Sequence, residues 1–266
     1  MARSTTISKS LTVNQMELLK LLDNEEIQIF SLDNIRSITH FEPDILSEII
    51  ENLVQKDFLS RIERGKYCRN IFRDENVIGT FVIADSAVAY WSALNIHGLT
   101  EQFANTIFVQ SIHKKKPKTI FGTSYQFVQI SESKRAGIQY NGYGNYRYPV
   151  TDVDKTIADC FDLPQYSGGY AELIRAFDRA NLNSEKLISY CTAIGNISAT
   201  KRLGFLAEYL QKEKLSSFIT FAKANVNQSY GLFDPTGNDQ GEFNSTWKMK
   251  LNISRDEITG IVNDNY

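Results

Sequence analysis

The sequence predicts an α+β fold in two parts: a small, mainly helical N-terminal module and a larger domain in which helices and strands are mixed. Two observations lead to this prediction. Apolar residues recur every three or four positions over residues 11–56 and 151–224, which is typical of amphipathic helices. Residues 106–140 contain stretches rich in β-branched and aromatic residues, which are typical of strands. The pattern changes near Val77, so we expect domains at residues 1–75 and 76–266.

The N-terminal module is expected to contain three helices followed by a hairpin. In order, the elements are a helix over 11–22, a short apolar stretch over 27–30, a brief helix capped by Ser31 or Asp33 that reaches Arg36, a helix from Pro43 to about residue 56, and a hairpin over 58–69. Pro43 suits the first turn of a helix, because its missing N–H is not needed there. Gly65 can supply the positive φ of a hairpin turn. This order is typical of a winged helix-turn-helix, whose third helix enters the major groove of DNA while the wing hairpin follows the phosphates.

The distribution of charge favours DNA binding at the wing more than at the third helix. The chain holds 29 Lys and Arg against 31 Asp and Glu, which excludes a polycation. Residues 1–55 nevertheless hold four basic and nine acidic side chains, whereas residues 56–73 hold six basic and two acidic ones. The third helix carries Asp44, Glu48 and Glu51 on its polar face, and these carboxylates repel phosphate. A small packing or dimerisation module is therefore the alternative interpretation.

Seven side chains of the module are candidate DNA contacts. The candidate phosphate contacts on the wing are Arg61, Arg64, Lys66 and Arg69. The weaker candidates, on or near the third helix, are His40, Ser47 and Asn52.

The first part of the larger domain is expected to be mainly β. Residues 81–94 are apolar and small, which is compatible with a strand or turn and then a buried helix from about Ser86, capped by Asp85 or Ser86. Strands are expected at 106–110, 119–121, 125–130 and 137–140. The loop between the first two carries His113 and the lysines Lys114, Lys115, Lys116 and Lys118. This loop is either a solvated turn or an electrostatic contact to nucleic acid.

The remainder is expected to be mainly helical. Helices are expected from a capping-box-like start at 151–154 to Pro164, over 170–180, from a Ser184 cap to Gly195, over 200–211, and over 215–224 as the last helix. Two strand-like pieces at 230–233 and 247–253 follow, joined by the turn-rich residues 234–241. Arg202 is expected either to pair with Glu208 or another helix acid, or to contact nucleic acid or a protein partner.

No pattern in the chain favours catalysis, and we expect a protein that is not an enzyme and has no metal or cofactor. The acidic residues that could form a carboxylate cluster are Asp152, Asp154, Asp159 and Asp162. The first two fit a helix N-terminus, and the other two have no histidine nearby in sequence. The histidines His40, His97 and His113 are isolated, and no glycine-rich nucleotide-binding loop is present.

Cysteine usage and hydropathy favour a cytoplasmic protein. Cys68, Cys160 and Cys191 are few, odd in number and widely spaced, so reduced thiols are expected. Residues 1–6 lead into polar sequence without the apolar core of a secretory signal. The most apolar stretch, over 77–91, is too short to span a bilayer, so no membrane partner is expected.

Several ordered segments resemble the AbiEi family of antitoxins. They are Phe81–Ala87, Gly98–Phe103, Tyr148–Cys160, Leu163–Gly169, Lys201–Glu208 and Gly231–Pro235, together with Trp247 and Asn252. The matches keep their order from about residue 10 to residue 253, so the resemblance extends over nearly the whole chain.

The resemblance implies a bacterial antitoxin and transcriptional autorepressor of a type IV toxin–antitoxin operon that acts in abortive infection, a phage defence. In that family a winged-helix domain binds inverted repeats in operator DNA, and the larger domain counteracts a nucleotidyltransferase-like toxin without needing a stable complex. The acidic third helix departs from what operator binding requires. The alternative is an interaction protein that does not bind DNA and restrains a toxin by direct contact.

Overall fold

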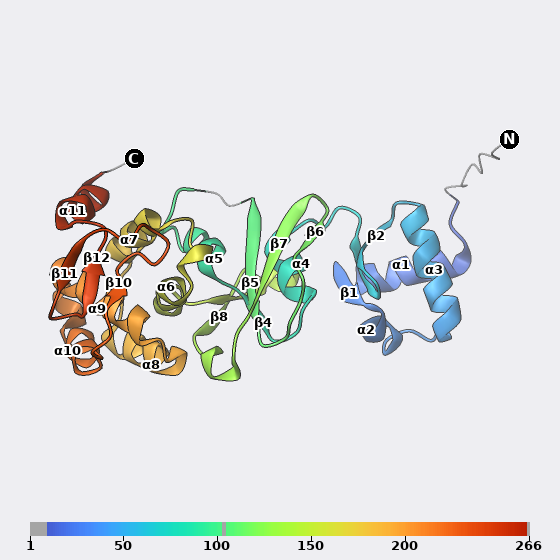
Figure 1. Ribbon diagram of the computed structural model, residues 1–266. Helices are drawn as coiled ribbons and strands as arrows, with labels where there is room; N and C mark the ends of the chain where they lie inside the picture. The colour runs from blue at the N-terminus through green and yellow to red at the C-terminus, as the bar shows by residue number, and fades with distance from the viewer. Residues whose placement is uncertain (1–9, 103–104, 265–266) are drawn as a thin grey trace.

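The computed structural model describes residues 10–102 and 105–264, and the chain is a mixed α/β protein. Figure 1 shows a helical module at the N-terminal end, a mixed sheet in the middle, and helices with a small sheet at the other end. The N-terminal residues 1–6, whose sequence was examined for a signal, and Phe103 lie outside the described residues.

The N-terminal module has the element order expected from the sequence. Its elements are α1 (Val13–Asn24), β1 (Ile29–Ser31), α2 (Leu32–Arg36), α3 (Pro43–Gln55), β2 (Leu59–Glu63) and β3 (Lys66–Arg69). The strands form an antiparallel sheet in the order β1-β3-β2. Ser31 caps α2 and Pro43 starts α3, as predicted. A core that includes Leu18, Leu46 and Leu53 closes the helices over the sheet.

A mixed six-stranded sheet forms the middle of the molecule. Its strands are β4 (Ser86–Val88), β5 (Thr106–Ser111), β6 (Lys118–Ile120), β7 (Thr123–Gln129), β8 (Ile138–Asn141) and β9 (Tyr148–Thr151), in the order β6-β7-β5-β4-β9-β8. The β5–β7 and β4–β9 pairs are parallel. Helix α4 (Glu75–Phe81) covers one face so closely that a Cβ on Gly79 would lie 2.9 Å from the Tyr125 ring.

The expected helix from Ser86 is wrong. Ser86 begins β4, which is hydrogen-bonded between β5 and β9, and the helix α5 (Tyr90–Ile96) starts four residues later at an Ala89 cap. A helix that was not predicted occupies Glu75–Phe81, and Asp74 caps it. Most residues between Val77 and Leu94 are buried, and a continuous apolar run does not distinguish a buried strand from a buried helix.

Helices and a small sheet form the far end. The helices are α6 (Val153–Asp162), α7 (Tyr170–Arg179), α8 (Ser184–Ile194), α9 (Ile197–Tyr209), α10 (Ser216–Ala224) and α11 (Arg255–Asn263), and short 3-10 turns lie at Glu132–Lys134, Gly144–Tyr146, Pro164–Tyr166 and Glu213–Leu215. The strands β10 (Gly231–Leu232), β11 (Glu242–Asn244) and β12 (Met249–Leu251) pair in the order β10-β12-β11. These elements enclose the largest apolar core, which includes Phe205, Phe233 and Trp247.

Four local expectations in this part are corrected. Asp152 rather than Thr151 caps α6, because Thr151 is still paired in β9. Asn183 rather than Ser184 caps α8, and α9 begins at Ile197 under an Asn196 cap. Helix α10 is not the last helix, because α11 follows with a Ser254–Glu257 capping box that was not recognised.

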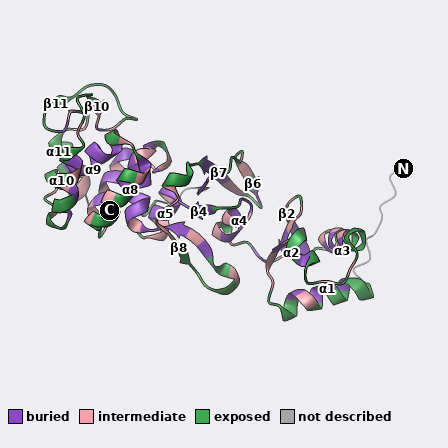
Figure 2. Cartoon of the chain, turned by 90° about the horizontal axis from the view of Figure 1, so that it is seen from below, coloured by how far each residue is buried: buried purple, intermediate pink, exposed green. Residues whose placement is uncertain are grey.

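The core of the central sheet extends across the domain boundary expected at residue 75. Ile62, Cys68 and Phe72 pack in one core with Val109 and Val150 of the sheet. Figure 2 shows that buried residues reach from the sheet into the helical end, while α1 is largely exposed along its length. In the described part of the chain, no helix is long and apolar enough to cross a membrane. Cys68, Cys160 and Cys191 are free and buried.

Candidate nucleic-acid interface

The β2–β3 hairpin, called the wing hairpin below, points toward the central sheet. The amide of Leu32 donates to the carbonyl of Gly65 at its turn (2.8 Å), and Lys66 Nζ donates to the carbonyl of Val82 (2.7 Å). Figure 1 shows β2 on the side of the module that faces α4 and β6. The wing hairpin is therefore held against the larger domain.

Glu63 at the end of β2 collects three lysines. Its carboxylate accepts from Lys115 Nζ (2.9 Å to Oε2) and Lys118 Nζ (3.2 Å to Oε2), and Lys66 Nζ lies 3.2 Å from Oε1. Burial alone would raise the pKa of the Glu63 carboxyl, but the hydrogen bonds from Lys115, Lys66 and Lys118 outweigh it, so the pKa lies below its ordinary value. Glu63 stays ionised and joins the wing hairpin to the loop of residues 113–118.

These contacts make one cationic surface from two segments that are fifty residues apart. We call it the wing–loop surface; its cations are Arg64, Lys66, Lys114, Lys115, Lys116 and Lys118. Three of the six positive charges contact the carboxylate of Glu63, in a chain whose formal net charge is −2. Arg64, Lys114 and Lys116 are exposed, and within residues 10–102 and 105–264 their side chains make no hydrogen bond or ion pair. They are available to an external anion.

The other two wing cations are occupied within the module. Arg61 lies 3.5 Å from the Glu51 carboxylate, and Arg69 donates to Asp23 at 2.6 Å. Arg61 keeps 45% of its side chain exposed, whereas Arg69 keeps 21%. The structure therefore brings Arg64 and Lys66 together with the lysine loop but separates Arg69 from it.

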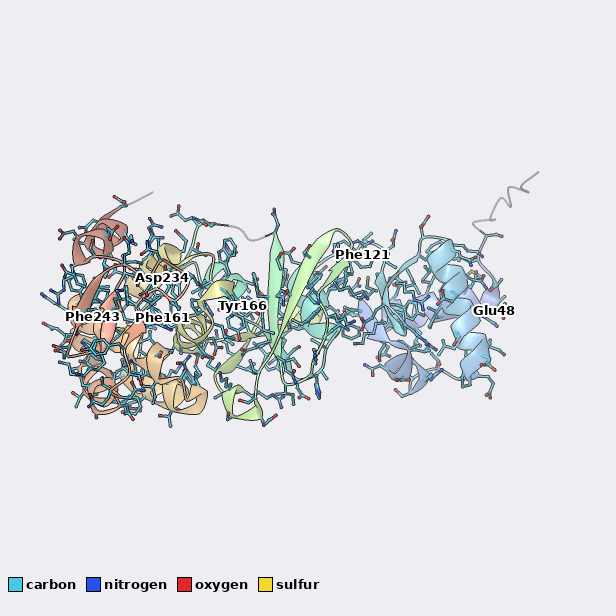
Figure 3. The ribbon with its side chains drawn as sticks, in the orientation of Figure 1. Glu48, Phe121, Phe161, Tyr166, Asp234 and Phe243 are labelled. Carbon is cyan, nitrogen blue, oxygen red and sulfur yellow. The ribbon has the colours of Figure 1, made fainter. Side chains whose placement is uncertain are left out.

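The candidates on and near α3 lie at the other end of the module. Figure 3 shows Glu48 on α3 at the end of the molecule farthest from the C-terminal helices. Ser47 Oγ donates to the carbonyl of Pro43, and His40 lies 3.7 Å from Glu17. Asn52 lines a depression of about 390 Å³ together with Val13, Glu48 and the half-exposed Ile45. This face is apolar and acidic, and it does not adjoin the wing–loop surface.

Arg202 belongs to the interior. It is 7% exposed, and its Nε donates to the carbonyl of Leu232 (3.1 Å). The expected ion pair with Glu208 is wrong, because that carboxylate accepts from Trp247 Nε1 (2.7 Å) and from Lys223. Arg202 therefore holds α9 to the small sheet and has little surface to offer a partner.

The four aspartates of the α6 region are used internally. Asp152 accepts from Tyr190 (2.8 Å) and Lys186 (2.9 Å), and Asp154 accepts from the amide of Asn183. Asp162 accepts from Lys134 and Asn196, and Asp159 pairs with the buried Lys155. Among the described residues, no three His, Cys, Asp or Glu side chains are grouped so that they could hold a metal ion.

A cleft of about 510 Å³ lies beside the wing–loop surface, and Lys66 belongs to both. Its other walls are the segment after α4 and the strands β8 and β9. The lining includes Phe81, Asp85, Arg135 and Tyr140. Asp85 accepts from Arg135 (2.6 Å) and faces His113 Nε2 at 3.2 Å. The guanidinium carbon of Arg147 lies over the Tyr140 ring, 4.2 Å from its centroid.

Sequence reasoning missed the residues that organise this region. Glu63 counted only as a charge that reduced the wing's excess, and Asp85 only as a helix cap. Only the start of the tyrosine-rich segment 138–148 falls in a predicted strand, at 137–140, and its density of tyrosines was a signal that could have marked it as a surface of interest. The contacts that join these segments depend on long-range packing, which spacing along the chain does not reveal.

Comparisons with known proteins support the fold. No protein-family model matches the chain, and no curated protein matches it in sequence. In fold, the chain is similar to the crystal structure of the RV2827C protein from Mycobacterium tuberculosis, with a TM-score of 0.64 and 12% sequence identity over 97% of each chain. At this identity, the likeness shows the fold alone.

Proposed function

We propose that this protein is a cytoplasmic DNA-binding regulator that represses its own operon and acts as the antitoxin to a nucleotidyltransferase-like toxin. The observation that carries the DNA-binding part is the wing–loop surface, where Glu63 gathers Lys66, Lys115 and Lys118 beside the exposed Arg64 and Lys116. Clustered lysines and arginines that can displace condensed counterions from phosphates supply most of the affinity of such proteins for DNA. The antitoxin part rests on the resemblance to the AbiEi family.

The acidic face of α3 changes how the protein would engage DNA. Asp44 and Glu48 face solvent and repel phosphate, so we place the main phosphate contacts on the wing–loop surface and assign α3 at most a minor share. Affinity should then depend strongly on salt and weakly on the substitution of α3 side chains. Base contacts from His40, Ser47 or Asn52 would add specificity only if α3 reached the major groove.

Binding to the DNA upstream of the protein's own gene tests this proposal. We expect an electrophoretic mobility shift with that DNA at a lower protein concentration than with a coding fragment of equal length. We also expect expression of the protein to lower transcription from the same promoter fused to a reporter. Equal affinity for both fragments, with an unrepressed reporter, would contradict an operator-binding role.

A second candidate function is direct restraint of a toxin without DNA binding. The observation that favours it is the free end of the module, where Val13 (73% exposed), Met16 and Ile45 are exposed beside Glu17 and Glu48. Exposed apolar residues with acidic neighbours suit a basic, partly apolar protein surface. Co-expression with the neighbouring gene's product distinguishes the two functions: a complex that survives gel filtration and is lost in Ile45→Asp favours direct restraint.

A further inference from the structure

The β8–β9 hairpin, residues 138–151, exposes an unusual number of tyrosines. Tyr140 is 63% exposed, Tyr143 at its tip 82%, and Tyr146 46%. Large aromatic side chains on a surface generally mark a binding site, because exposing their rings to water is unfavourable. Tyr146 has an internal contact, since its ring lies 5.2 Å from that of Phe72. Tyr143, and the face of the Tyr140 ring that Arg147 leaves open, remain for an external partner.

Basic groups lie beside Tyr140. Arg147 lies over the Tyr140 ring, and the cleft that Tyr140 lines also contains Lys66 and Arg135. Tyr140 pairs with Pro149 across the hairpin, and Arg147, two residues before Pro149, falls on the same face. Ile138 and Pro149 complete an apolar floor on this face. The cleft therefore combines flat aromatic and apolar surfaces with cations.

The hairpin is fixed in place. Asn145 donates to the carbonyl of Glu26 in the N-terminal module, and Asn141 donates to the hydroxyl of Tyr148. These contacts hold the hairpin across the junction between the module and the sheet. A binding surface that is already ordered loses less conformational entropy when a ligand binds.

We propose that this cleft binds single-stranded nucleic acid, with bases stacked on Tyr140 and Tyr143 and phosphates held by Arg147, Arg135 and Lys66. Aromatic side chains along a cationic groove are the arrangement with which proteins hold single strands without reading their sequence. The paired bases of a duplex cannot stack on these rings, so the cleft is a site distinct from duplex binding by the exposed cations Arg64 and Lys116. Arg135 pairs with Asp85 and Lys66 with Glu63, whereas Arg147 has no carboxylate partner in the described part of the chain, so Arg147 is the cation most available to a phosphate.

Fluorescence anisotropy with three labelled probes tests the proposal: a twelve-nucleotide oligothymidylate, a twelve-nucleotide oligouridylate and a twelve-base-pair duplex. Replacing both rings in Tyr140→Ala/Tyr143→Ala should weaken single-strand binding about tenfold or more, because each stacked base contributes substantially to affinity. Duplex binding should change less than about twofold. Tyr140→Phe/Tyr143→Phe, which keeps the rings, should retain single-strand affinity. Tighter binding of one of the two single strands identifies DNA or RNA as the natural ligand.

Tyr230→Ala is the matched control. Tyr230 is also exposed (46%) and has a cation, Lys248, at 5.5 Å from its ring centroid, but it lies on the small sheet at the other end of the molecule. The Tyr230→Ala variant should bind all three probes as tightly as the wild type does. Unchanged single-strand affinity in the double alanine variant, with an unchanged melting temperature, would overturn the proposal. An equal loss of affinity for the single strands and for the duplex would also overturn the proposal. So would a double alanine variant that no longer associates with a protein partner but keeps its single-strand affinity.

This test is independent of the operator proposal. Removing Arg64 and Lys116 probes duplex binding, whereas removing Tyr140 and Tyr143 probes the cleft. Either proposal can therefore fail while the other stands.

Discussion

Glu63 shows how one carboxylate can build a cationic surface. On a wing that contacts DNA, an acidic side chain would be expected to reduce affinity. Here it lies between Lys66, Lys115 and Lys118, and its side chain is 18% exposed. It relieves repulsion among three ammonium groups while leaving a net positive charge. Its role is therefore to position the lysines.

Glu63→Gln removes the negative charge that lies between the three lysines. Removing the charge should free the lysines for phosphate, so that duplex affinity rises and the slope of log K against log[salt] steepens by about 0.9 for each additional phosphate contact. The free energy of unfolding should fall by about 1 kcal/mol, because three charge-assisted hydrogen bonds are weakened. Anisotropy titrations and urea denaturation measure the two effects. A loss of duplex affinity would contradict this expectation, because it would mean that phosphate contact requires the lysines to be held by Glu63.

The pH dependence of this contact has a defined sign. The pKa of Glu63 in the folded chain lies below the ordinary value of 4.5. Its contribution to stability is thus present above about pH 4.5 and is lost as the pH falls through the lowered pKa. Glu63→Gln should lack this component of acid destabilisation, and wild type and variant should converge in stability at the lowest pH.

Lys155 and Asp159 form a buried ion pair in α6. Lys155 has no exposed side-chain surface and Asp159 has 3%, and burial raises the pKa of Asp159 to about 6 despite the neighbouring ammonium. Asp159→Asn should lower the free energy of unfolding by about 3–5 kcal/mol, because it leaves Lys155 charged and buried without a carboxylate. Lys155→Met/Asp159→Asn should recover most of that loss in urea denaturation. A double variant as unstable as Asp159→Asn alone would show that the pair is not coupled.

At the scale of elements, local signals predicted the helices of the N-terminal module best. Ser31 and Pro43 stand at the starts of the second and third helices, and all three helices form within a few residues of the expected bounds. The secondary structure of segments that are buried on all sides was harder to predict from the sequence. The run from Val77 to Leu94 folds into α4, β4 and α5, and its apolar continuity contains no period that could separate them. Burial by distant strands decides the outcome there.

Helix α9 packs closely against its neighbours at Gly204. A Cβ on Gly204 would lie 2.5 Å from the Trp247 ring and 2.7 Å from Cβ of Ala222, so helix α9 approaches α10 and the small sheet as closely as a glycine allows. Gly204→Ala should lower the free energy of unfolding by about 1–3 kcal/mol through overpacking. Gly260→Ala in α11, where nothing lies within 4 Å, should be stabilising by about 0.5–1 kcal/mol. Urea denaturation of both variants measures the contrast, and an equal effect would contradict the packing argument.

At the scale of the whole molecule, long-range contacts determine where charge accumulates. The sequence placed cations on the wing and in the loop at 113–118, and both groups were correctly identified as segments. Their union could not be predicted, because it depends on the wing hairpin facing the sheet. Arg73 stacks on Phe121 across the same junction, with its guanidinium carbon 4.1 Å from the ring centroid, and Figure 3 places Phe121 on the side of the sheet next to the module.

The same geometry separates the two faces of the N-terminal module. The wing hairpin and its lysines lie inward, while α3 with Asp44 and Glu48 lies at the free end. A winged-helix protein that binds DNA through α3 would need the opposite distribution of charge. The proposed function therefore depends on the wing–loop surface. DNA binding can be tested most directly at this surface.

The most direct measurement is the salt dependence of duplex binding by Arg64→Ala/Lys116→Ala. Each lost phosphate contact should reduce the slope of log K against log[salt] by about 0.9, so the double variant should lose about 1.8. Lys214→Ala/Arg255→Ala removes two exposed cations from the helical end and is the matched control, expected to keep the wild-type slope. A wing–loop variant whose slope equals that of wild type and control would contradict DNA binding at this surface.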